Sequence, residues 1–112
     1  MHIYKIFRRS EWAGLLAEGR TAGAPVDLAD GFIHFSTADQ LPGTLAKHFA
    51  GESGLVLAVL EGDALGPELR WEPARGGEFF PHLYRILRLE DVIFSQNLRD
   101  APGGPVLPDH LP

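Results

Sequence analysis

The chain has 112 residues, enough for one domain with its own core, and it has no cysteine, which excludes disulfides, thiolate metal sites and thiol nucleophiles. Its ten basic and fifteen acidic residues give a net charge of −5, so no overall field attracts nucleic acid and we expect no such partner. No apolar run is long enough to cross a membrane, and the first residues lack the pattern of a signal peptide. We therefore expect a cytoplasmic protein without a membrane partner.

The beginning of the chain predicts a strand, a helix and a loop. Residues 2–7 have the alternation of a strand, with Lys5 between two apolar neighbours on one face. Lys5 either extends its amine to the rim of that face or projects into a cleft where it meets an anion. A helix over residues 10–17, capped by its serine, should end at Gly19 in the left-handed conformation. The segment 20–30 has the Gly, Pro and Asp content of a surface loop.

The sequence Asp-Gly-Phe-Ile-His-Phe-Ser-Thr predicts a turn, a strand and a helix start. Residues 32–36 carry aromatic side chains on both faces, which is typical of a central strand. His34 on such a strand either has hydrogen-bond partners in the core or lines a cleft. Thr37 and Gln40 have the spacing of a capping box. Ser36 and Thr37 beside a helix N-terminus could hold a phosphate or carboxylate, and the alternative is an ordinary cap.

A helix and a buried strand follow. The helix over residues 38–50 has an apolar stripe that includes His48, which we expect to be packed. Pro42 makes its first turn irregular, or else the regular helix starts near Pro42. The continuous apolar run 55–60 has the length of a strand buried on both faces, and we expect it at the centre of the sheet.

The second half of the chain predicts shorter strands. Residues 68–72 alternate as a half-buried strand with Leu69 and Trp71 on one face. The Gly-rich segment 73–77 should be a flexible loop, and the segment 79–84 is dense in aromatic rings and broken by a proline.

Two further strands are expected at residues 85–89 and 92–98, and four prolines in the segment 101–112 predict a tail without regular structure. The whole pattern predicts one small α+β domain over residues 1–112, with mixed or antiparallel sheets and two main helices.

Ionisable groups are interleaved with aromatic rings in the second half of the chain. The ionisable groups are Arg70, Glu72, Arg75 and His82, and the rings interleaved with them include Trp71 and Tyr84. Such a set beside a glycine loop could bind a planar group and a phosphate, and the alternative is that the rings are ordinary core. The histidines have no zinc spacing, and neither a nucleophile elbow nor a P-loop occurs, so we expect no metal site.

Several motifs together resemble the small bacterial family catalogued as domain of unknown function 952. They are Gly-Phe-Ile-His-Phe-Ser-Thr (31–37), Lys-His-Phe (47–49), Arg-Trp-Glu-Pro (70–73), Arg-Gly-Gly-Glu (75–78) and Phe-Pro-His-Leu-Tyr (80–84). That family has no established activity. Its fold resembles that of ADP-ribosyltransferases and RNA 2′-phosphotransferases, so the resemblance implies an ADP-ribosylation-like fold and an NAD- or ADP-ribose-like ligand in a cleft between two small sheets.

The chain matches those transferases at one of two characteristic positions. Their first strand ends in a His-Gly-Thr or His-Gly-Ser motif that holds the NAD ribose, and the matching place here reads Tyr-Lys-Ile-Phe (4–7). Their second strand carries Tyr or His at the position of His34, which this chain keeps. The resemblance therefore implies a cleft of that shape but leaves the cofactor open.

Two hypotheses about function follow. The first is an enzyme acting on a nucleotide or another phosphate-bearing small molecule, with His34 and His82 as acid–base groups and Glu72 stabilising a cationic centre. The ligand would also meet Lys5, Ser36, Thr37, Arg70, Trp71, Arg75 and Tyr84. The second hypothesis is a binding or sensing module that kept the cleft and lost the chemistry. The oligomeric state stays open.

Overall fold

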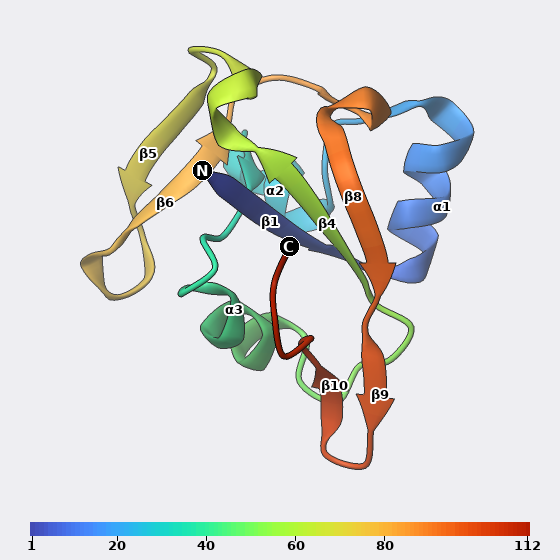
Figure 1. Ribbon diagram of the computed structural model, residues 1–112. Coiled ribbons are helices and arrows are strands. Elements are labelled where there is room, and N and C mark those ends of the chain that lie inside the picture. The colour runs from blue at the N-terminus through green and yellow to red at the C-terminus, as the bar shows by residue number, and fades with distance from the viewer.

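Strand β4 (Val56–Glu61) is the centre of the main sheet, as its uninterrupted apolar run predicts. In the computed structural model, which describes residues 1–112, β4 pairs antiparallel with β1 (His2–Phe7) on one side and with β8 (Val92–Asn97) on the other (Figure 1). The prediction of a buried central strand is therefore confirmed.

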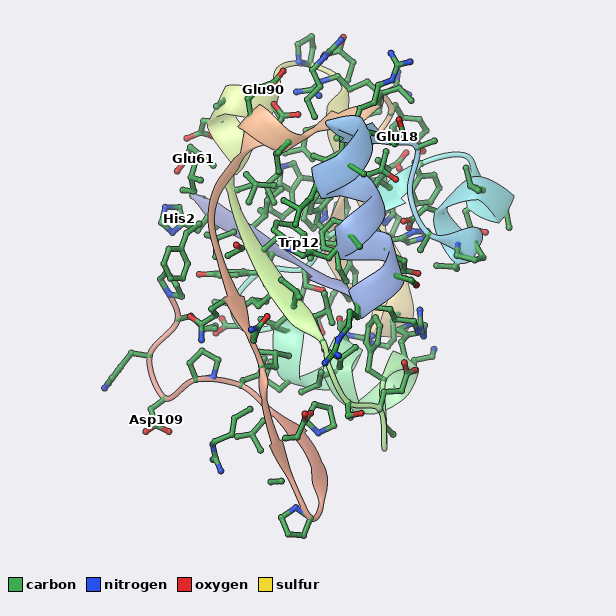
Figure 2. All side chains as sticks on the ribbon, turned by 90° about the vertical axis from the view of Figure 1, so that its right-hand side faces the viewer. His2, Trp12, Glu18, Glu61, Glu90 and Asp109 are labelled. Atoms are coloured by element: carbon green, nitrogen blue, oxygen red, sulfur yellow. The ribbon has the colours of Figure 1, made fainter.

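The core lies on both faces of this sheet because β1 and β4 alternate between two apolar clusters. The first cluster packs against helix α1 (Arg9–Glu18) and includes Ile3, Phe7, Leu15, Ala58 and Leu60. Trp12 of α1 packs against it, with its ring edge-on to Phe7 at a centroid distance of 5.3 Å (Figure 2). The second cluster packs against helix α3 (Leu41–His48) and includes Tyr4, Ile6, Leu45, Leu57 and Val59.

A second, three-stranded antiparallel sheet has the order β3-β6-β5. It consists of β3 (Ile33–His34), β6 (Phe79–Leu83) and β5 (Leu69–Pro73). Two small pairs complete the fold, β2 (Arg20–Thr21) with β7 (Leu87–Arg88) and β9 (Arg99–Ala101) with β10 (Gly104–Val106). Single turns of 3-10 helix cover residues 62–65, 75–77 and 89–91.

The chain after β3 joins the two sheets. The N–H of Phe35 donates to the carbonyl of Pro81 in the second sheet at 3.0 Å. One residue later, Ser36 and Tyr4 of β1 exchange two backbone hydrogen bonds of 2.9 and 2.8 Å. His34 and Ser36 are thereby held at the junction of the sheets. Because β3 lies at the edge of its sheet and β6 in the middle, the prediction of a central strand at residues 32–36 is wrong.

The helix boundaries follow local capping. Helix α1 ends at Gly19, whose φ of 74° is the predicted left-handed conformation. Its N-cap is Arg8 instead of Ser10, because the carboxylate of Glu11 accepts the Arg8 N–H at 2.8 Å. Helix α3 begins beside Pro42, which was one of the two alternatives, and the predicted hydrogen bonds between Thr37 and Gln40 close the turn before it.

The segment 20–30 is not a loop, because it forms β2 and a third helix, α2 (Pro25–Asp30). The fold is thus a single α+β domain with antiparallel sheets and three helices instead of two. A proline in the first turn has no N–H to leave unpaired, and the carboxylate of Asp27 accepts the N–H of Ala24 at 2.8 Å. These two features stabilise the start of α2.

The proline-rich tail also differs from its prediction, since β10 lies within it and pairs with β9. The prolines are tolerated because this hairpin has no further strand beside it. Leu107 and Leu111 pack against the α3-side cluster, so the tail lies on the surface of the domain. None of the three helices combines the length and the apolar character needed to span a bilayer.

Candidate functional site

A cavity of about 670 Å³ opens between α2, α3 and the junction of the two sheets. Its walls come from β1, the first turn of α1, α2, residues 34–36, α3, the loop between β5 and β6, and β6 itself. In Figure 1, α2 and α3 lie apart on either side of β1. The volume is within the range of small-molecule sites.

Asp27 is the buried polar centre of the α2 end of the cavity, with 1% of its surface exposed. Its Oδ1 accepts the backbone N–H of His34 at 3.1 Å and lies 2.6 Å from Nδ1 of the His34 ring. Its Oδ2 accepts the N–H of Ala24 at 2.8 Å and lies 3.0 Å from Nζ of Lys5. Both oxygens of Asp27 are therefore fully used within the protein.

These contacts keep Asp27 ionised. Burial raises the pKa of Asp27, but the hydrogen bond with His34, the charge of Lys5 and the N–H of Ala24 together outweigh it and lower the pKa from 3.8 to about 2. Lys5 is itself buried and lies between the rings of Phe7 and Phe35. Of the two alternatives for Lys5, projection into a cleft is the one observed, although its anion is a carboxylate of the protein.

The ring of His34 lies between two carboxylates and contacts both. Its Nδ1 faces Asp27, and its Nε2 lies 2.9 Å from Oδ2 of Asp30, the last residue of α2. Both ring nitrogens can donate at once only when the imidazole carries two protons. A third of the side chain is exposed, and it lines the cavity.

His82 is directly opposite His34 in the second sheet, and their ring centroids are 5.4 Å apart. The His82 ring is buried and stacks on Phe32 at 4.1 Å. Its Nδ1 lies 2.8 Å from Oε1 of Glu72, which also accepts the hydroxyl of Tyr84 at 2.7 Å. The Nε2 of His82 has no hydrogen-bond partner. When Nδ1 donates to the carboxylate, Nε2 has a lone pair free to accept a proton.

The hydroxyl of Tyr84 is the main cause of the lowered pKa of Glu72, followed by the hydrogen bond with His82. Glu72 is therefore an anion, and its hydrogen bond fixes the orientation of the His82 ring.

The opposite end of the cavity is cationic. Arg75 lies against the ring of Phe80 at 5.0 Å, and its Nη2 donates to Oγ1 of Thr44 at 3.3 Å. Neither Arg75 nor Lys47 forms an ion pair with a carboxylate, and both line the cavity. The pKa of His48 is lowered, first by partial desolvation in the cavity wall and then by the charges of Lys47 and Arg75. An anion in this part of the cavity would therefore be attracted.

Five of the residues singled out from the sequence line the cavity: Lys5, His34, Ser36, Arg75 and His82. The other five do not. Glu72 and Tyr84 lie behind His82, Arg70 covers the Tyr84 ring at 4.6 Å, and Thr37 is engaged in the cap. Trp71 is 42% exposed and lines a separate hollow of about 250 Å³ beside Met1 and Gly62.

Sequence reasoning missed Asp27 and Asp30 because it treated their segment as a loop. The sequence Ala-Pro-Val-Asp would have predicted the start of α2, because it has a proline in the first turn and an acidic residue three positions after the cap. His48 was expected to be packed, but it is exposed and lines the cavity. No three histidine, aspartate or glutamate side chains are grouped closely enough to hold a metal ion.

The chain belongs to the family described as "Protein of unknown function (DUF952)", whose model matches residues 6–95. This confirms the family to which the motifs pointed. No curated protein matches the chain.

Among solved structures, the chain is similar to Protein CC0527 from Caulobacter crescentus, with 47% identity and a TM-score of 0.90 over 95% of this chain and 94% of that chain. A double mutant of that protein matches at 45% identity and a TM-score of 0.90, with the same coverage. Its solution NMR structure matches at 47% identity and a TM-score of 0.83, over 93% of this chain and 90% of that one.

Proposed function

We propose that the cavity binds a nucleotide or a related phosphate-bearing small molecule. The observation that carries the proposal is that Arg75 and Lys47 line one small cavity without a carboxylate partner, although the whole chain has a net charge of −5. The hydroxyls of Ser36 and Thr44 lie 2.8 Å apart in the same wall. The Thr44 hydroxyl donates to the carbonyl of Gln40 and accepts from Arg75, so this pair positions the guanidinium that would bind the phosphate.

An enzymatic role is the stronger form of this proposal. It is supported by His82, because its imidazole is held by Glu72 on one nitrogen and is unpartnered on the other. The unpartnered Nε2 is buried, so this role requires a side-chain movement that opens it to the cavity. In this form the protein is a diverged member of the ADP-ribosyltransferase-like or phosphotransferase-like enzymes, with His34 at the second-strand position. In the same proposal the protein is cytoplasmic, and its ligand resembles NAD or ADP-ribose.

A non-catalytic binding module is the second candidate. It is favoured by His34, whose two ring nitrogens are both engaged by carboxylates and so are not free to exchange a proton with a ligand. The first-strand histidine of the transferases is also absent, since Lys5 and its neighbours stand there. Both candidates share the anion site and differ only in turnover.

The first test is a thermal-shift screen of nucleotides, sugar phosphates, ADP-ribose and NAD. A ligand at one hundred times its dissociation constant stabilises the protein by about 2.7 kcal/mol, which corresponds to a shift of roughly 10 °C for a domain of this size. Arg75→Ala should weaken binding of the hit at least tenfold, because it removes a charge-assisted hydrogen bond. Arg99→Ala, which changes an exposed arginine of the β9–β10 hairpin, is the matched control.

Equal weakening by both substitutions would mean that only the overall charge matters. If no phosphate compound binds, the proposal is overturned. Product analysis after incubation with the hit then separates the two candidates, because only an enzyme converts its ligand, and His82→Ala should abolish that conversion.

A further inference from the structure

The carboxylate of Asp30 is the one feature of the cavity that an anion site alone does not explain. Its Oδ2 contacts Nε2 of His34, but its Oδ1 has no hydrogen-bond partner, and the side chain is 49% exposed. Asp27, its neighbour on α2, has both oxygens saturated within the protein. Asp30 is therefore the acidic group of the α2 end that has a free acceptor for a ligand.

We infer that the ligand carries sugar hydroxyl groups in addition to its phosphate, and that Asp30 accepts a hydrogen bond from those hydroxyls while Arg75 binds the phosphate. The inference rests on the proposed function and narrows it to phosphorylated sugars and the nucleotides that contain them. A carboxylate that accepts from vicinal hydroxyls is a recurrent means of holding ribose.

The strong charges around Asp30 are already matched within the protein. Lys5 lies 3.0 Å from Asp27 and donates to the carbonyl of His34, and Arg8 lies against Glu52. A ligand hydroxyl can therefore donate to Oδ1 of Asp30 without displacing an ion pair. An ammonium group in the same place is the alternative that the experiment below distinguishes.

The size of the cavity supports a ligand that extends from one end to the other. A volume of about 670 Å³ is far more than a phosphate ion requires, and it falls in the range of sites for organic ligands. Its lining includes the rings of Phe35, beside Lys5, and Phe80, beside Arg75, together with Phe49, and these rings provide apolar surface for the carbon face of a sugar or for a base. Phosphate and hydroxyls can thus be bound at different ends of the same molecule.

Isothermal titration calorimetry with inorganic phosphate, ribose 5-phosphate and O-phosphoethanolamine tests the inference. Wild-type protein should bind ribose 5-phosphate at least tenfold more tightly than the other two compounds, because only this compound satisfies Asp30 with a neutral donor. Asp30→Ala should remove that advantage and leave the affinity for inorganic phosphate within twofold of its wild-type value. Asp30→Asn, which keeps an acceptor oxygen, should retain part of the advantage.

Asp100→Ala removes an exposed carboxylate of the β9–β10 hairpin and should change none of these affinities. Equal affinity for inorganic phosphate and ribose 5-phosphate, or an unchanged affinity for ribose 5-phosphate in Asp30→Ala, would overturn the inference and leave the proposed anion site standing. Tighter binding of O-phosphoethanolamine, lost in Asp30→Ala, would also overturn it by identifying an amine as the donor. If none of the three compounds binds, the inference and the proposed function both fall.

Discussion

The ammonium nitrogen of Lys5 lies 3.0 Å from Oδ2 of Asp27, and both side chains are almost fully buried beside the cavity. This contact joins β1 to α2, so it also fixes the position of Asp30 at the end of that helix. A buried ion pair is tolerated because each charge has a partner, and the loss of one partner leaves the other uncompensated. The pair is therefore a structural support for the candidate site.

Replacing Asp27 by Asn should lower the free energy of unfolding by about 3–5 kcal/mol, because Lys5 would keep a buried charge without a counter-ion. Urea denaturation at neutral pH measures this loss. The double variant Lys5→Met/Asp27→Asn should recover a large part of it, since no uncompensated charge remains. Asp100→Asn, an exposed control, should stay within about 0.5 kcal/mol of the wild type. A double variant as unstable as the single one would contradict this account.

Acid should weaken the wild-type protein through Asp27. The pKa of this group is lowered from 3.8 to about 2 in the folded state, so the unfolded chain binds the proton more readily. Its contribution is fully present above about pH 5 and is lost as the pH falls from there towards 2. The lowering corresponds to about 2 kcal/mol.

The double variant Lys5→Met/Asp27→Asn lacks the carboxyl group of residue 27, so comparing it with the wild type isolates the contribution of Asp27 to the pH dependence of stability. Urea midpoints measured from pH 6 to pH 2 should fall more steeply for the wild type than for the double variant. Parallel profiles would show that other carboxylates account for the acid sensitivity.

The sequence predicted those parts of the fold that depend on near neighbours. The alternation of β1, the apolar run of β4 and the glycine at the end of α1 are local signals, and all three elements are present. The turn closed by Thr37 and Gln40 was predicted for the same reason. In each case the residues that indicate the structure lie within a few positions of one another in the chain.

The remaining features depend on contacts distant in sequence. Whether Lys5 faces solvent or a cleft is decided by Asp27, and whether Asp27 is buried is decided by how α2 packs. Trp71 has the pattern of a half-buried strand, yet it is exposed in the middle of β5, which is an edge strand of its sheet. The edge position of β3 likewise follows from its pairing with β6, which its own residues do not encode.

Replacing Tyr84 by Phe should raise the pKa of Glu72. That pKa is lowered from 4.5 mainly by the hydrogen bond from the Tyr84 hydroxyl, and the contact with His82 makes the next largest contribution. Without the hydroxyl, Glu72 should titrate closer to 4.5 while His82 still holds it below that value. NMR titration of the side-chain carboxyl carbon measures the change. The pKa of Glu61, which is lowered by the N-terminal ammonium, should be the same in both proteins.

Replacing His82 by Phe should change the free energy of unfolding by less than about 1 kcal/mol. The substitution removes a buried Nε2 that has no partner, which is favourable, and it removes the hydrogen bond to Glu72, which is not, so the two effects offset each other. Glu72 keeps the hydroxyl of Tyr84 and a third of its surface in solvent, and the new ring can still stack on Phe32.

His34→Phe is the comparison for that experiment, because it takes a hydrogen bond from the buried carboxylate of Asp27 and should cost about 2 kcal/mol or more. Urea denaturation of the two variants gives both values. A His82→Phe variant that is nearly as stable as the wild type would show that the fold does not need this imidazole, which is what the proposed acid–base role requires. If His82→Phe proves as costly as His34→Phe, the ring of His82 is needed for folding, and its unpartnered nitrogen no longer argues for acid–base chemistry.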